Sequence, residues 1–90
     1  MNRMDKTWQE FETHFNQVDA NFYQRLIARF PTLTSNEKKL CAFIRLNLST
    51  KEICAITQRS QKSIEMARTR LRQRLNLLRD QPLSAVIAAI

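Results

Sequence analysis

The stretch STKEICAITQRSQKSIEMARTRLRQRL, residues 49–75, contains two helix-start signals in close succession. Ser49 and Glu52 form the first, because the serine hydroxyl can accept from the third amide of a helix while the glutamate reaches back. Ser60 is an N-cap candidate for the next helix, with Ser63 three residues further on. The spacing predicts a helix of about eight residues, a turn of about three, and a longer basic helix over about residues 61–75. This order is the helix-turn-helix arrangement.

Similar signals occur in the rest of the chain. Thr34 and Glu37 form another capping box, so a helix is expected to begin directly after Thr34. Pro31 should end an earlier helix, since the residue before a proline leaves the α region. A last helix should begin near Pro82, because proline suits a first helical position.

The composition favours an all-helical fold. The 90 residues include no glycine and two prolines, and 43% of them are apolar. Hairpin turns and phosphate-cradling loops are hard to build without glycine, and so short a chain buries only one modest core. We therefore expect an all-α protein. Residues 1–31 are expected to form one or two helices that serve as a connecting or dimerisation segment. Residues 32–90 are expected to form a helix-turn-helix DNA-binding domain.

The N-terminal segment carries an apolar seam with the 3-4-3-4 spacing of a heptad pattern: Trp8, Phe11, Phe15, Val18 and Phe22. Asp19 can interrupt this seam as the N-cap of a second helix. Because so short a seam does not specify a coiled coil, two interpretations stay open. The seam packs inside the chain, or it mediates dimerisation or continues a helix from an upstream region.

The cysteines indicate a reducing compartment. Cys41 and Cys54 both fall within apolar helical patterns, where buried thiols are expected rather than a disulfide, as suits the cytoplasm. A zinc site needs about four ligands, and the two cysteines and the lone His14 are too few. We expect no metal and no cofactor. The longest apolar stretch, residues 85–90, is too short to span a bilayer, so no membrane contact by this segment is expected.

The charge is concentrated in one segment. The chain carries a formal net charge of +7, yet residues 1–30 hold four basic and four acidic side chains and sum to zero. Residues 59–79 hold seven basic residues and one acidic residue, Glu65. This distribution indicates a local surface for binding a polyanion.

A helical wheel divides the basic helix into faces. Ile64, Ala67, Leu71 and Leu75 form the apolar stripe, and Arg68 lies close to it, so its stem is expected to pack. In a major groove, the opposite face would meet base edges and the flanks would meet phosphates. The expected base-reading residues are Lys62, Glu65, Met66, Thr69 and Gln73. The expected phosphate contacts are Lys51, at the start of the preceding helix, and Arg70, Arg72 and Arg74.

Two interpretations of Glu65 stay open. Its carboxylate could accept from cytosine N4 and repel a misplaced phosphate, which would make it a discriminating residue. Alternatively, it pairs within the helix with Arg68 or Thr69.

Residues 33–78 resemble the LuxR-type (GerE-like) helix-turn-helix, the DNA-binding output domain of many bacterial transcription regulators. The likeness rests on Leu33-Thr34 with Glu37, on Leu48-Ser49 through Ile53, and on Ser63-Ile64 at the start of the basic helix. It implies a four-helix unit starting near Ser35, whose final helix, after Pro82, often forms a dimer contact in this family. The stretch IEMARTRLRQRL is similar to a subgroup found at the C-terminus of larger receptors, which implies an upstream sensor domain.

The chain also departs from the family pattern. The family usually has a basic residue and then a histidine where this chain has Glu65 and Ala67. Its turn commonly includes glycine or asparagine, where this chain has Thr57-Gln58-Arg59. A left-handed residue here would cost Gln58 about 1 kcal/mol, so we expect a turn of different shape.

The favoured hypothesis is a bacterial transcription regulator that binds double-stranded DNA sequence-specifically, as a homodimer. A module similar to sigma-factor region 4, which would also bind RNA polymerase, is one alternative. Another is a helical protein-interaction or dimerisation module. Catalysis is not expected, because no carboxylate pair or nucleophile–base arrangement stands out.

Overall fold

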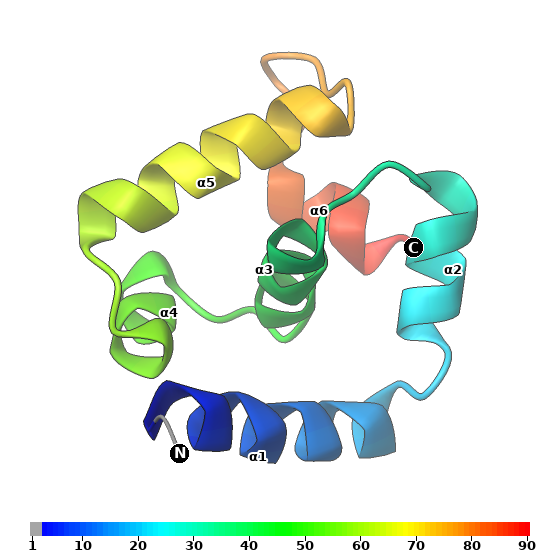
Figure 1. The fold of residues 1–90 in the computed structure, drawn as a ribbon. Helices are drawn as coiled ribbons and strands as arrows, with labels where there is room; N and C mark the ends of the chain where they lie inside the picture. Colours follow the sequence, from blue (N-terminus) through cyan, green and yellow to red (C-terminus); the bar gives the residue numbers. More distant parts are fainter. Residues whose placement is uncertain (1–2) are drawn as a thin grey trace.

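A computed structural model describes residues 3–90, with side chains from residue 9 onward. Within that range the chain forms helices and no strand, which confirms the all-α prediction (Figure 1). The six helices are α1 (Arg3–Val18), α2 (Phe22–Arg29), α3 (Ser35–Arg45), α4 (Thr50–Thr57), α5 (Gln61–Arg74) and α6 (Leu83–Ala88).

Side-chain caps fix the starts of α3 and α4. The Thr34 hydroxyl accepts from the Glu37 amide at 3.2 Å, and the Glu37 carboxylate accepts from the Thr34 amide at 2.8 Å. Ser49 and Glu52 make the same reciprocal pair at 3.1 and 3.0 Å. These capping boxes satisfy amides that would otherwise lack partners, so both predicted helix starts are confirmed. Helix α6 begins near Pro82, as predicted, although Pro82 is its N-cap and not its first helical residue.

Asparagine takes the place of glycine where α3 and α5 end. Asn47 and Asn76 have φ of 60° and 54°, in the left-handed region that asparagine tolerates. The Leu48 amide donates back to the Phe43 carbonyl at 3.2 Å, and the Leu77 amide donates to the Arg72 carbonyl at 3.1 Å. Both ends therefore form Schellman motifs without glycine.

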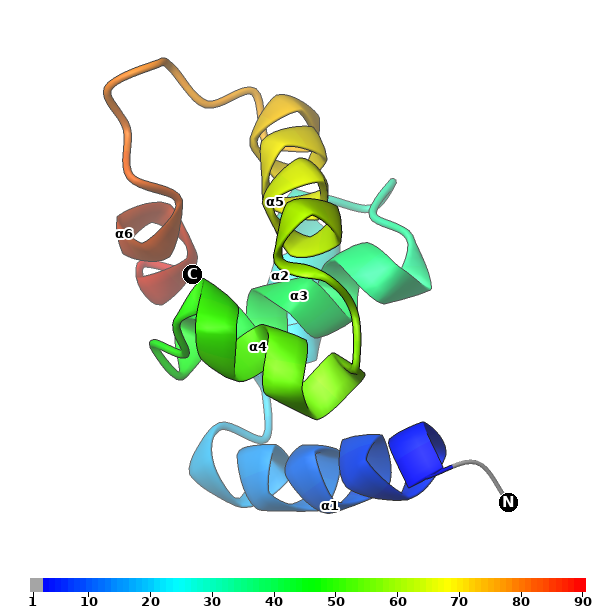
Figure 2. The ribbon, with the colours of Figure 1, turned by 90° about the vertical axis from the view of Figure 1, so that its left-hand side faces the viewer.

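Helix α3 occupies the middle of the fold (Figure 1). Helices α5 and α6 contact it, and α4 contacts both α5 and α1. Helix α1 lies on the side of the molecule opposite α5, as both views show (Figures 1 and 2). The N-terminal helix therefore packs against the helix-turn-helix through α4 and leaves α5 at the far surface.

The aromatic seam, which runs along α1 to the first residue of α2, packs inside the chain. Phe15 and Phe22 are fully buried, with ring centroids 5.3 Å apart, and the Phe11 ring lies tilted against that of Phe43 of α3, with centroids 4.5 Å apart. These rings belong to the same buried cluster as the apolar residues of α3, α4 and α5. Val18 is 59% exposed, and the side chain of Trp8 lies outside the described residues. For the described rings, the intramolecular interpretation is confirmed.

Asp19 does not cap α2, contrary to the sequence prediction. Helix α2 begins at Phe22 with Asn21 as N-cap, and no side chain accepts from its first amides. Instead, the Asp19 carboxylate accepts from Arg25 Nη2 at 2.7 Å and lies 3.7 Å from Arg45 Nε. The carboxylate is thus engaged by two guanidinium groups and not by the first amides of α2.

Both cysteines are free thiols, and their surroundings differ. Cys41 of α3 is fully buried, and this burial raises the pKa of its thiol to about 12. Cys54 of α4 is partly buried. Of the helices in the described part of the chain, none combines the length and the apolar character needed to cross a bilayer.

Candidate nucleic-acid interface

The turn between α4 and α5 sets how the basic helix lies on the domain. Gln58 adopts φ 58° and ψ 28°, so the left-handed residue occurs without glycine and the expectation of a different turn is wrong. Its amide donates to the Cys54 carbonyl at 2.8 Å. The left-handed conformation of Gln58 costs about 1–2 kcal/mol of folding free energy. This cost is offset because the turn lets Ile53 and Ile64 bury their side chains on either side of it.

Helix α5 begins at its predicted cap, and three residues of its predicted stripe are buried while the fourth, Ala67, is partly buried. The Ser60 hydroxyl accepts from the Ser63 amide at 3.1 Å. Ile64, Leu71 and Leu75 are at most 5% exposed, and Arg68 beside them is partly buried. Helix α4 has 8 residues and α5 has 14, so the predicted short-helix, turn and long-helix order is confirmed.

The five residues expected to read bases share one surface, which we call the outward face of α5. All five side chains are exposed, and Met66 is 48% exposed despite being apolar. Because the opposite side of the helix is buried against the domain, this face is the one a partner can reach. The outward face consists of Lys62, Glu65, Met66, Thr69 and Gln73.

Glu65 is held on the outward face by its own helix. Gln61 Nε2 donates to Glu65 Oε1 at 3.0 Å, one turn earlier. The Thr69 hydroxyl donates to the backbone carbonyl of Glu65 at 3.1 Å and not to its carboxylate. The intrahelical partner of the carboxylate is therefore Gln61, in place of the expected Arg68 or Thr69. A carboxylate can accept several hydrogen bonds, so Glu65 keeps acceptor capacity toward a partner.

Arg72, an expected phosphate contact, is bound to the loop between α5 and α6. Its Nη1 donates to the Gln81 carbonyl at 2.7 Å, and its Nη2 donates to the carbonyls of Leu78 and Arg79 at 2.8 and 3.3 Å. The guanidinium thus ties this loop to the helix. Sequence reasoning missed this role because backbone acceptors leave no side-chain signal.

Arg74 is also engaged within the domain. Its Nε lies 3.2 Å from Glu37 Oε2, and the two side chains are 49% and 15% exposed. Glu37 therefore caps α3 and holds the last turn of α5 at the same time. The pair brings together residues 37 positions apart, which no local pattern could reveal.

The other two expected phosphate contacts are less constrained. Arg70 is exposed and makes no hydrogen bond or ion pair with any described residue. Lys51 is exposed in the first turn of α4. The Ser49 amide and hydroxyl hold the pKa of the neighbouring Glu52 carboxyl below its usual range.

Comparisons of the chain with protein-family models, with curated proteins and with solved structures found no match.

Proposed function

We propose that the protein is a transcription regulator that binds double-stranded DNA sequence-specifically, with α5 lying in the major groove. The observation that carries this proposal is the outward face of α5. It is an exposed, mixed polar surface on the second helix of a capped helix–turn–helix unit. That is the position from which such units present side chains to base edges.

The chemistry of the outward face suits base recognition better than simple phosphate attraction. Lys62 and Gln73 supply donors for the acceptors that guanine and adenine present in the major groove. Glu65 can accept from cytosine N4, and Met66 can contact the thymine methyl group. A face with donors, an acceptor and an apolar group can distinguish base pairs, whereas a uniformly basic face cannot.

Attraction to the phosphates comes from the formal charge of +7 and from cations beside the outward face. Arg70 and Lys51 are the direct contacts we propose, because neither is tied to another part of the described chain by a recorded ion pair. Arg72 and Arg74 act differently in this proposal. They fix the C-terminal end of α5 to the α5–α6 loop and to α3, so they orient the outward face.

The sequence resemblance to LuxR-type domains supports a bacterial regulator that works in the cytoplasm as a homodimer, as the output part of a larger protein. We propose that α6 forms the dimer contact, since Ser84, Ala85 and Ala88 leave one of its faces exposed. Paired half-sites about one helical turn of DNA apart would then be bound. Light scattering of the protein with such a duplex would show two chains per DNA.

Salt dependence of DNA affinity tests the proposal. Fluorescence anisotropy with a labelled duplex should show log affinity falling linearly with log salt, by about 0.9 for each phosphate neutralised. Lys51→Ala should reduce this slope by about 1. Arg29→Ala, which removes the same charge from α2, should leave the slope unchanged. Salt-independent affinity, or equal effects of the two variants, would exclude this interface. A stable dimer with no DNA retention at low salt would favour the protein-interaction alternative.

A further inference from the structure

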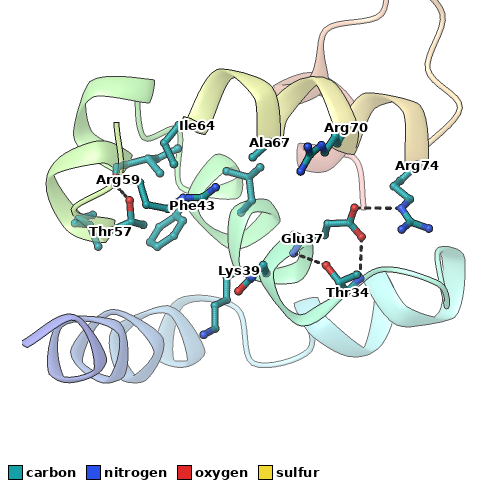
Figure 3. A pocket seen from close by; sticks show the side chains of 14 residues that line it. Thr34, Glu37, Lys39, Phe43, Thr57, Arg59, Ile64, Ala67, Arg70 and Arg74 are labelled. Carbon is teal, nitrogen blue, oxygen red and sulfur yellow. Dashed lines mark hydrogen bonds and ion pairs between the residues drawn. The ribbon is translucent and has the colours of Figure 1, made fainter. Parts of the chain in front are cut away.

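A cavity of about 390 Å³ lies between α3, α4 and α5, beside the inner edge of α5 (Figure 3). Its volume falls in the range of small-molecule sites, which hold roughly 300–1,000 Å³. Apolar side chains form its floor, and the two partly buried ones, Ile56 and Ala67, leave apolar surface that a ligand can contact. The side chains of the floor are Leu40, Phe43, Ile53, Ile56, Ile64 and Ala67.

Positive charge surrounds this apolar floor. Arg59, Arg70 and Arg74 line the cavity, and Glu37 is the one carboxylate among its lining residues. Glu37 is already paired with Arg74 and with the Thr34 amide. Lys39 also lines the cavity, but Figure 3 shows its side chain extending away from α5 toward α1.

Two of the guanidinium groups at the cavity are not paired with a carboxylate of the described residues. Arg70 forms no hydrogen bond or ion pair with any described residue. Arg59 donates through Nε and Nη2 to the Ser63 hydroxyl at 3.0 and 2.7 Å, a neutral partner that leaves its charge uncompensated. In Figure 3, Arg59 lies beside Phe43 and Arg70 lies further along α5, so the cations approach the cavity from two positions. A cavity of this kind is complementary to an anion with an apolar body.

We infer that this cavity binds a small amphipathic carboxylate. Its hydrocarbon part packs on Ile56 and Ala67, the two partly buried apolar residues of the lining, and its carboxylate accepts from Arg59 or Arg70. A guanidinium suits this task because its planar array of donors matches a carboxylate. The volume lies near the lower end of the ligand-site range, so a medium-chain acid fits better than a long-chain one. This inference does not depend on the proposed DNA binding.

Isothermal titration calorimetry on the full chain tests the inference, with decanoate below its micelle concentration as the probe. Decanoate should bind with one site per chain. Decanol, which lacks the charge, and inorganic phosphate, which lacks the apolar body, should each bind at least about tenfold more weakly. Equal binding of decanol or phosphate, or no binding of decanoate, would overturn the inference.

Substitutions of cavity residues test whether the cavity is the binding site. Arg70→Gln and Arg59→Gln should together weaken decanoate binding by about tenfold or more, since they remove the charge-assisted hydrogen bonds. Arg79→Gln removes one cation from the α5–α6 loop, away from the cavity lining, and should leave the affinity unchanged. Circular dichroism would confirm that each variant is folded. If Arg79→Gln weakens binding as much as the double variant, the cavity is not the site.

Discussion

The outward face of α5 and the C-terminal flank of the same helix are both polar, yet the structure uses them differently. On the outward face, Glu65 and Thr69 make hydrogen bonds only within α5. On the flank, Arg72 is bonded to three loop carbonyls and Arg74 is paired with Glu37 of α3. The number of arginines on a basic helix is therefore not the number of cations that the helix offers to a partner. Some arginines hold the helix, and others remain available to a partner.

The difference also separates two kinds of mutational effect. A change on the flank should alter stability and the orientation of α5, and thus affect all DNA sequences alike. A change on the outward face should leave stability nearly constant and alter which sequence is preferred. Substitutions on the buried side, on the flank and on the outward face of α5 test this separation.

The largest expected effect compares the buried side of α5 with its outward face. Leu71→Ala should lower the free energy of unfolding by about 2–5 kcal/mol, because Leu71 is fully buried and truncation leaves a cavity. Met66→Ala should change it by less than about 0.5 kcal/mol, since Met66 is 48% exposed. Urea denaturation measures both. Comparable losses would mean that Met66 packs against the domain and that the outward face is smaller than described.

Arg72→Ala should lower the free energy of unfolding by about 1.5–3 kcal/mol, because its guanidinium donates to several carbonyls of the α5–α6 loop. Arg79→Ala is the matched control: it removes the same charge from that loop while keeping the backbone carbonyl. We expect it to cost less than about 0.5 kcal/mol. Equal losses in thermal or urea unfolding would show that net charge, and not the loop bonds, accounts for the effect.

The turn before α5 offers a gain in stability. Gln58→Gly should raise the free energy of unfolding by about 1 kcal/mol, because glycine adopts the left-handed conformation without the Cβ clash. Asn47→Gly should gain less, since asparagine already tolerates this region. Denaturation of the two variants side by side checks this order. A loss of stability in Gln58→Gly would contradict the left-handed turn.

The smallest stability effect belongs to the surface ion pair of the flank. Arg74→Gln should lower the free energy of unfolding by about 0.2–1 kcal/mol at low salt, since the Arg74 side chain is 49% exposed. The loss should nearly vanish at about 1 M salt, where the screening length is about 3 Å. A loss that persists at high salt would show that Arg74 acts through packing rather than charge.

Much of the fold could be predicted because its signals are local. The boxes at Thr34 and Ser49 and the cap at Ser60 act across three residues, so the sequence alone locates the starts of α3, α4 and α5. The apolar stripe of α5 has helical periodicity, which is also local. Asp19 was misassigned because its preferred partners, Arg25 and Arg45, come together only in the folded chain.

The candidate site was predictable to a similar degree. The outward face follows from the periodicity of one helix, and the structure exposes all five of its predicted residues. The roles of the flanking arginines could not be predicted from this periodicity. Arg72 finds its acceptors in a loop backbone, and Arg74 finds Glu37 across the fold. The cavity lined by Arg59 and Arg70 likewise exists only because α3, α4 and α5 pack around it.

Selection of bound sequences from a pool of random duplexes would decide whether the outward face of α5 reads DNA. Wild type should enrich a defined sequence. Glu65→Ala and Thr69→Ala should each enrich an altered one, because a base contact contributes about 1–3 kcal/mol of discrimination. Arg79→Ala should enrich the wild-type sequence. If no sequence is enriched, or if all four proteins select the same one, the outward face does not recognise DNA sequence.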